Sequence, residues 1–223
     1  MYLITKRFFD IIFSAIAILF LSPLFIPIII LLKLTSEGDV FFFQERIGMN
    51  NKPFKIFKFA TMLKNSSTMK GGYITVKNDP RVTFVGGFLR KSKINELPQL
   101  FNIFLGHMSV IGPRPVMRVS FESYPENIQK VIYNVKPGLS GIGSIIFRDE
   151  EEIISKVKTE GGDIWNFYKN TIYPFKGRLE LWYQKKKSLI LDLQLIILTA
   201  FVIIFPDSRI SEKWFKDLPR RNF

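Results

Sequence analysis

A long apolar segment near the start of the chain limits the folds that this sequence can adopt. From Phe8 to Leu32 it runs for 25 residues (32 − 8 + 1), interrupted only by Asp10, Ser14 and Ser22. As one helix it would be roughly 37 Å long, enough to cross a hydrocarbon core of about 30 Å. It has no small-residue cleavage site, so we do not expect a cleaved signal peptide.

Two prolines within this segment argue against a straight transmembrane helix. Pro23 and Pro27 each remove a backbone donor, and Ser22 can bond a carbonyl freed in this way. Cations flank both ends of the segment, at Lys6, Arg7 and Lys33. A hairpin keeps all of them on the cytoplasmic face, as the positive-inside bias favours. We therefore expect a re-entrant helix bent at Ser22 and Pro23, with a single span as the alternative.

A second apolar run, Leu189–Phe205, contains Asp192 and Gln194, follows three lysines at 185–187 and stops at Pro206. It is short for a membrane span. An interfacial helix whose lysines contact anionic lipid fits this pattern, and a buried core helix fits it almost as well.

Composition excludes several classes of protein. With 223 residues, 47% hydrophobic and 23% charged, the chain can bury a core and is not a disordered polymer. It has no cysteine and one histidine, which excludes disulfides, a thiolate nucleophile and cysteine- or multi-histidine-ligated metals. The net charge of +13 (32 − 19) indicates a polyanionic partner: nucleic acid, anionic lipid or phosphorylated small molecules.

Most of this charge lies between Gln44 and Lys93, where eleven cations and two acids give 11 − 2 = +9. The cations are Arg46, Lys52, Lys55, Lys58, Lys64, Lys70, Lys77, Arg81, Arg90, Lys91 and Lys93. Within the stretch, 41–43 predicts a strand, 48–51 a turn, and 54–59 a half-buried strand with its lysines on one face. The charge fits a solvated face beside an anionic membrane or a phosphate-binding site. No nucleic-acid-binding motif accompanies it, so we expect no nucleic acid partner.

The clearest candidate site begins at Asn95. Apolar residues at 97, 100, 101, 104 and 105 form one helical face, which Gly106 ends. Asn95 is then the N-cap and Pro98 lies in the first turn. Free N–H groups, the helix dipole and the cations of 90–93 converge on Glu96, which would stay ionised and hold a divalent cation beside a phosphate. Ordinary capping is the alternative.

A second candidate follows in Gly112-Pro113-Arg114-Pro115, where two prolines stiffen the chain around one arginine. Its forked guanidinium suits phosphate oxygens, and a rigid loop with a surface arginine is the alternative. His107, alone just past a helix end, is expected to be structural.

Several ordered blocks of the chain resemble the bacterial sugar transferases, the small monotopic polyprenyl-phosphate phosphoglycosyl transferases. The resemblance runs from Lys6 to about Phe205. Its blocks are Lys6–Asp10, Ser22-Pro23, Phe43–Gly48, Phe54–Met62, Glu96–Asn102, Met108–Pro115 and Lys136–Gly141.

The resemblance implies transfer of a sugar-1-phosphate from a UDP-sugar to a membrane polyprenyl phosphate, with release of UMP. It also implies Mg²⁺, a re-entrant hairpin, and a covalent phospho-sugar on an aspartate. On this basis we expect Glu96 to ligand the metal and Arg114 and Lys58 to clamp phosphate, with Arg46 and Arg90 behind them.

This chain departs from the family pattern at the expected nucleophile, where Asn95 replaces aspartate. An amide cannot form a stable acyl phosphate. Glu96 would then be the nucleophile, or the lipid phosphate would attack directly, or the replacement traps a state, or the protein only binds substrates. We favour an active enzyme.

Three further departures accompany this one. Ala60 stands where arginine is frequent in the family, and His107 where aspartate is frequent. The stretch after Gly143 also differs, and its acidic run at 149–152 is expected to begin a solvated helix, with donor-sugar selection as the alternative.

We therefore predict an α+β monotopic inner-membrane protein whose catalytic domain lies on the cytoplasmic face. Residues 1–34 would form the hairpin, 35–205 the catalytic domain with an interfacial helix, and 206–223 a tail. The partners would be a UDP-sugar, undecaprenyl phosphate and anionic lipids, and homo-oligomerisation is left open. The product would start an O-antigen, capsule or exopolysaccharide. The rivals are an inactive binding homologue and a single-span anchor with a basic binding module.

Overall fold

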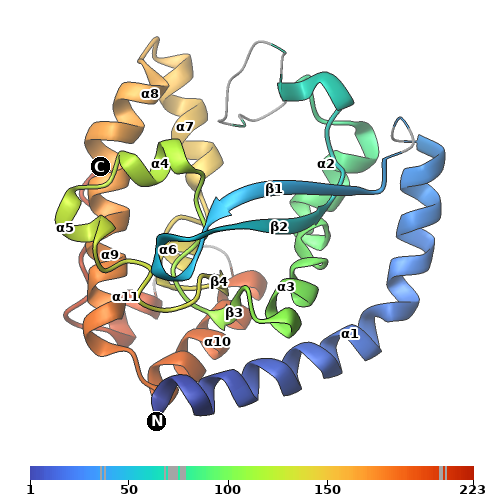
Figure 1. Ribbon diagram of the computed structural model, residues 1–223. Helices are drawn as coiled ribbons and strands as arrows, with labels where there is room; N and C mark the ends of the chain where they lie inside the picture. The colour runs from blue at the N-terminus through green and yellow to red at the C-terminus, as the bar shows by residue number, and fades with distance from the viewer. Residues whose placement is uncertain are drawn as a thin grey trace.

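The computed structural model describes residues 1–35, 37, 39–67, 69, 75, 79–205, 208 and 210–223. In this part of the chain the fold is α+β, with many helices and two small sheets, as predicted (Figure 1). Three residues named in the predictions, Lys70, Lys77 and Pro206, lie outside the described residues.

The elements follow one another with short connections. The α-helices are α1 (Tyr2–Thr35), α2 (Phe84–Lys91), α3 (Gln99–Leu105), α4 (Arg118–Glu122), α5 (Glu126–Gln129), α6 (Ile142–Ile146), α7 (Glu150–Thr159), α8 (Ile164–Phe167), α9 (Tyr173–Lys186), α10 (Leu189–Ile204) and α11 (Ile210–Trp214). Short 3₁₀ turns are η1 (Met49–Asn51), η2 (Lys64–Ser67) and η3 (Ile94–Glu96), and η4 (Tyr168–Ile172) is a π-helical turn that joins α8 to α9. The strands are β1 (Phe41–Ile47), β2 (Pro53–Phe59), β3 (Ser109–Ile111) and β4 (Gly138–Ser140).

Helix α1 is a single 34-residue helix that contains Pro23 and Pro27. Figure 1 shows that it runs along the bottom of the molecule and then turns upward, so it is bent. Ser22 Oγ donates to the Leu19 carbonyl at 2.8 Å. That carbonyl is the one four residues before Pro23, whose ring nitrogen carries no hydrogen to donate. The serine hydroxyl thus satisfies a carbonyl that the proline leaves open.

The polar residues in the first half of α1 are anchors to the rest of the chain. Lys6 Nζ lies 2.6 Å from Asp192 Oδ2 of α10, and both side chains are about nine-tenths buried. Tyr2 and Tyr183 add their hydroxyl groups to the same carboxylate, at 2.9 and 2.8 Å. This buried cluster fixes the start of α1 against α9 and α10.

Two further α1 residues bind the backbone of neighbouring elements. The Arg7 guanidinium donates to the carbonyls of Ile103 and Phe104 at 2.6 and 2.7 Å, where a cation favours the carboxyl end of α3. Asp10 Oδ1 accepts from the Ser109 hydroxyl at 3.0 Å and from the next backbone N–H at 2.9 Å. Asp10 and Arg7 therefore tie α1 to β3 and α3.

The second half of α1 also contacts the same domain. Phe25, Ile28 and Leu32 are buried in a cluster with Phe59 of β2 and Leu89 of α2. Both halves of the bent helix therefore pack on one body, while its other face presents large apolar side chains to the surroundings.

Strands β1 and β2 form an antiparallel pair that runs from Phe41 opposite Phe59 to Ile47 opposite Pro53. The predicted strands and turn are confirmed. The expectation that the lysines of β2 share one face is wrong, because side chains alternate along a strand. Lys58 lies on the face of buried Ile56, whereas Lys55 lies on the other and is exposed.

Strands β3 and β4 are parallel, with Ser109 opposite Gly138 and Ile111 opposite Ser140. A Cβ on Gly138 would lie 2.1 Å from the Gly112 nitrogen, so only glycine allows the two chains to approach this closely. This tight pairing sets the path of the Arg114 loop that leaves β3.

Helix α10 combines the two interpretations of the second apolar run. Leu195 and Leu198 are fully buried in the main core, whereas Ile190, Leu193 and Ile197 are exposed. After α11, Leu218 is buried as well. The end of the chain thus packs on the domain.

Candidate active site

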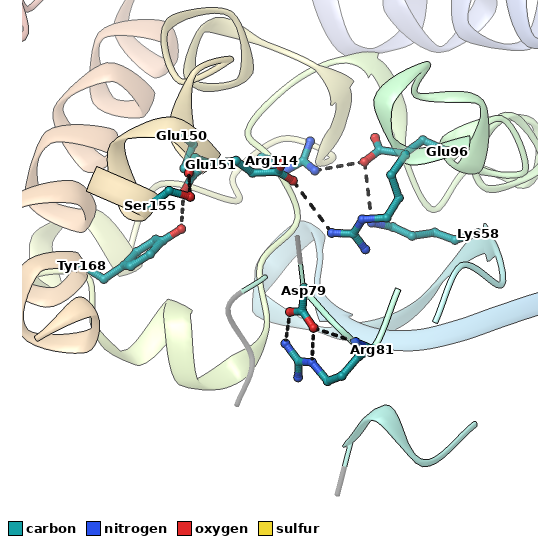
Figure 2. Close-up of polar contacts among 10 residues, drawn as sticks. Lys58, Asp79, Arg81, Glu96, Arg114, Glu150, Glu151, Ser155 and Tyr168 are labelled. Atoms are coloured by element: carbon teal, nitrogen blue, oxygen red, sulfur yellow. Dashed lines mark hydrogen bonds and ion pairs between the residues drawn. The ribbon is translucent and has the colours of Figure 1, made fainter. Parts of the chain in front are cut away.

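Glu96 lies between two of the predicted cationic residues. Its Oε1 is 3.1 Å from Arg114 Nη2 and 3.7 Å from Lys58 Nζ, and Figure 2 shows the three side chains pointing toward one another. Glu96 ends η3, Lys58 comes from β2 and Arg114 from the loop after β3. The Glu96 side chain is 14% exposed and that of Arg114 is 44% exposed, so the pair is open on the arginine side.

The charges around Glu96 keep it ionised. Burial alone would raise the pKa of Glu96, but the positive charges of Arg114, Lys58 and Lys93 hold this pKa well below its ordinary value. Glu96 in turn raises the pKa of Arg114. A carboxylate with these partners is an acceptor at any pH where the protein would work.

The cations also crowd one another. Burial lowers the pKa of Lys58 to about 8, and Glu96 opposes this shift while Arg114, Arg46 and Arg90 add to it. Burial, followed by the charge of Arg114, lowers the pKa of Arg46 to about 10. The site therefore holds more positive charge than its own carboxylate compensates.

The predicted helix start at Asn95 is wrong. Lys93, in the left-handed region at φ 60°, begins the turn η3, and α3 starts only at Gln99. The N–H groups of Glu96 and Leu97 donate to the carbonyls of Lys93 and Ile94, so they are not free for an anion. Positive side chains supply the charge instead. Gly106 ends α3 at φ 90°, as predicted.

Asn95 itself is buried beside Glu96, with 6% of its surface exposed. It makes no capping hydrogen bond, and its Oδ1 has no partner among the described residues. A buried polar atom without a partner costs free energy, which is typical of positions that meet a ligand.

Asn102 of α3 fixes the distance between the two sides of the site. Its Oδ1 accepts from the Phe57 N–H, and its Nδ2 donates to the Lys55 carbonyl, each at 2.8 Å. The amide thus pairs with β2 as a neighbouring strand would. The sequence analysis quoted this residue only as part of a family block.

Two buried residues hold the loop that carries Arg114. The Tyr133 hydroxyl donates to the Arg114 carbonyl at 2.8 Å and accepts from the Val116 N–H at 3.2 Å. The Glu180 carboxylate accepts from the Arg114 N–H. Both residues were missed, because an isolated tyrosine or glutamate in an apolar stretch carries no local signal of a contact so distant in sequence.

Glu180 is an unusual carboxylate. It is 4% exposed, its Oε2 has no hydrogen-bond partner among the described residues, and burial raises its pKa to about 7. It supports the backbone of the site without facing the charged cluster directly.

Arg46, Lys58, Gln99 and Arg114 line a small cavity with Ile56 and Pro115. Its volume of about 20 Å³ fits about one water-sized group. Arg46 binds Gln44 Oε1 through one terminal nitrogen at 2.5 Å. Arg46 Nε and Gln99 Nε2 are buried donors with no partner among the described residues.

The acidic run at the start of α7 lies beside this site (Figure 2). Glu151 and Glu152 are exposed, as expected of a solvated helix start, and Arg90 Nη2 lies 3.9 Å from Glu151 Oε1. The expectation is wrong for Glu150, whose Oε1 binds Lys176 at 2.6 Å and Tyr168 at 2.7 Å. Asp149 is also paired, with Arg221.

The remaining departures lie at different depths. Ala60 is buried directly after β2, with its N–H on the Val40 carbonyl. His107 is exposed, with its ring 6.3 Å from that of Phe54. The described residues contain no cluster of three or more acidic, histidine or cysteine side chains that could hold a metal ion by themselves.

Comparisons with known proteins agree with this arrangement. The family described as bacterial sugar transferase matches residues 1–206. The chain is 35% identical over 187 residues to the exopolysaccharide production protein ExoY of Rhizobium meliloti, covering 77% of this chain and 82% of that protein.

Two longer proteins are also similar. The chain is 37% identical to a UDP-glucose:undecaprenyl-phosphate glucose-1-phosphate transferase of Klebsiella pneumoniae, covering 89% of this chain and 40% of that protein. It is 42% identical to a UDP-N-acetylgalactosamine-undecaprenyl-phosphate N-acetylgalactosaminephosphotransferase of Aeromonas hydrophila, covering 65% of this chain and 34% of that protein. This chain thus spans less than half the length of either.

A bent apolar helix packed on a domain with a carboxylate inside a cationic cluster defines a sugar-transfer protein of the membrane surface. The chain belongs to the bacterial sugar transferase family.

Proposed function

We propose that this protein transfers a sugar-1-phosphate from a UDP-sugar to undecaprenyl phosphate and releases UMP. The observation that carries the proposal is the Glu96 carboxylate held between Arg114 and Lys58 at the mouth of a cationic pocket. Three similar proteins that catalyse this class of reaction by name support it.

The charge of the site suits this chemistry. A donor diphosphate and an acceptor phosphate repel each other, and phosphoryl transfer depends mainly on positioning and on compensation of their charge. Arg114 can hold phosphate oxygens with its forked donors, and Lys58 adds a point charge. Arg46 and Arg90 strengthen the positive field behind them.

The bent helix supports a re-entrant position in the cytoplasmic face of the inner membrane. Both halves of α1 contact the same domain, through Lys6 on one side and Leu32 on the other. A straight span would carry one of these contacts across the bilayer. The exposed apolar faces of α1 and α10 would then lie in lipid, where the acceptor is confined.

Magnesium fits the oxygen atoms of this site. Mg²⁺ is usually held by one or two protein oxygens together with water and substrate phosphates. Glu96 and the unpartnered Asn95 Oδ1 are hard oxygen ligands on adjacent residues. When bound, the ion would shield the charge of the diphosphate.

Asn95 requires a different division of labour from that of the family. Because Asn95 cannot act as a nucleophile, the acceptor phosphate attacks the donor directly or Glu96 takes that role. Glu96 is already engaged by two cations, which favours its use in orienting Arg114 and Lys58.

The same residue favours one alternative, a homologue that binds these substrates without turnover. UMP release from a panel of UDP-sugars, with undecaprenyl phosphate and Mg²⁺, separates the two. UMP formation that needs the lipid and is lost in Glu96→Gln supports the enzyme. Binding of the donor without UMP formation from any sugar supports the alternative.

A further inference from the structure

We propose that the cavity between Arg46, Lys58, Gln99 and Arg114 is a phosphomonoester site, in which Gln99 Nε2 and Arg46 Nε donate to one phosphate oxygen. The inference rests on the proposed function, and it assigns a part of the substrate to a particular place in the site.

The first argument is the pair of donors without partners. Gln99 is 2% exposed, yet its Nε2 has no hydrogen-bond partner among the described residues, and the same holds for Arg46 Nε. Both side chains line the cavity. Burying a donor without an acceptor costs about 1 to 3 kcal/mol, which an oxygen placed in the cavity would recover.

The second argument is charge. Among the described residues, Arg46, Lys58 and Arg114 surround the cavity with three positive charges, and Glu96 compensates one of them. The nearby acids do not remove the excess, because Glu150 is paired with Lys176 and Glu151 lies beside Arg90. Three cations and one carboxylate leave a charge of +2.

A phosphomonoester matches this excess better than a diester does. A terminal phosphate carries between −1.5 and about −2 near neutral pH, whereas each phosphate of a sugar diphosphate carries one charge. The cavity, at about 20 Å³, receives one oxygen, and the rest of the group would lie at the mouth beside half-exposed Arg114. In the proposed reaction the phosphomonoesters are the polyprenyl phosphate acceptor and the product UMP.

Binding of inorganic phosphate to the full chain in detergent tests the site without any turnover. The thermal unfolding midpoint should rise with phosphate, and dimethyl phosphate, a diester, should have less effect. In Gln99→Met we expect about tenfold weaker phosphate binding, as for the loss of a hydrogen bond to a charged group. Lys55→Gln removes an exposed cation from the opposite face of β2 and should bind as the wild type does.

Arg46→Lys is a second variant, which keeps the charge and removes the Nε donor. It decides the question if Gln99→Met does not fold, and it should weaken phosphate binding to a similar degree. Repeating the titration with a short-chain prenyl phosphate and with UMP identifies the source, because the natural occupant is the one whose affinity falls most in these variants.

Two results would overturn the assignment: no stabilisation of the wild type by phosphate, or unchanged phosphate binding in a folded Gln99→Met and in Arg46→Lys. Neither result depends on catalysis. A protein that binds phosphate through Gln99 but never forms UMP would therefore refute the proposed reaction and leave the pocket in place.

Discussion

Arg114 Nη2 lies 3.1 Å from Glu96 Oε1, and this contact joins a stiff loop after β3 to the turn that precedes α3. The arginine side chain is 44% exposed, so the pair contributes little to stability. Its main effect is to aim a guanidinium toward the mouth of the cavity while Glu96 stays charged.

The first prediction concerns this carboxylate. Glu96→Gln keeps the volume of the side chain and removes the charge that orients Arg114 and Lys58. We expect kcat for UMP formation to fall at least about 100-fold, as for other losses of preorganised electrostatic groups. The unfolding midpoint should change little. Glu122→Gln, on the exposed helix α4, is the control, and near-normal turnover in Glu96→Gln would remove Glu96 from the mechanism.

The second prediction concerns pH. Burial lowers the pKa of Lys58 to about 8, so this lysine is charged below that pH and loses its charge as the pH rises through it. Activity and phosphate affinity should therefore fall above about pH 8. In Lys58→Arg the guanidinium stays charged, so the decline should move to higher pH. An unchanged pH profile in this variant would assign the decline to another group.

The third prediction concerns the bend in α1. In Pro23→Ala the backbone N–H can bond the Leu19 carbonyl again, which Ser22 now satisfies at 2.8 Å. We expect a straighter helix and a fraction of molecules with the N-terminus in the periplasm. Because the chain has no cysteine, one cysteine placed at Ile4 reports its accessibility to a membrane-impermeant thiol reagent.

The wild-type background should show this cysteine on the cytoplasmic side only, and Ser22→Ala should have a smaller effect than Pro23→Ala. Labelling from the periplasm in the wild type would contradict the hairpin. Unchanged labelling in Pro23→Ala would show that the contacts of Lys6 and Leu32 with the domain hold the bend without the proline.

Much of the local structure could be predicted from sequence. The β1–β2 pair follows from aromatic and basic residues between turn signals, and Gly106 marks the end of α3. Glu96, Lys58 and Arg114 lie together as expected, because charged residues in partly apolar surroundings stand out in a sequence. Their catalytic roles remain predictions.

The rest depends on contacts that no local pattern encodes. The left-handed conformation of Lys93 moves the helix start from Asn95 to Gln99, and a lysine gives no sign of it. Tyr133 and Glu180 reach Arg114 from segments distant in sequence. Such partners become visible only when packing has brought the segments together.

The fourth prediction concerns Glu180. Burial raises its pKa to about 7 in the folded chain, so between about pH 5 and pH 7 the folded state binds more protons than the unfolded state. The free energy of unfolding should therefore fall as pH rises through this range. Glu180→Gln keeps an oxygen for the Arg114 N–H and removes the titration. Relative to wild type it should gain stability with rising pH, by at most about 3 kcal/mol above pH 7.

Urea unfolding of both proteins in detergent across this pH range measures the difference. Glu126→Gln, at an exposed carboxylate in α5, should give a difference from wild type that hardly changes with pH. A flat difference for Glu180→Gln as well would mean that Glu180 is hydrated in solution and does not titrate near neutrality.

The fifth prediction restores the nucleophile that the family resemblance implies. Asn95 is 6% exposed and directly precedes Glu96, so Asn95→Asp would place a second carboxylate within the field of Lys58 and Arg114. Mixed with a UDP-sugar and Mg²⁺ without acceptor, this variant should release one equivalent of UMP and gain the mass of one phospho-sugar, seen by intact-mass measurement. The wild type should show no adduct, and the double variant Asn95→Asp/Glu96→Gln should form it more slowly. If Asn95→Asp forms UMP only when lipid is added and never carries an adduct, the site works by direct attack of the acceptor phosphate whichever residue stands at this position.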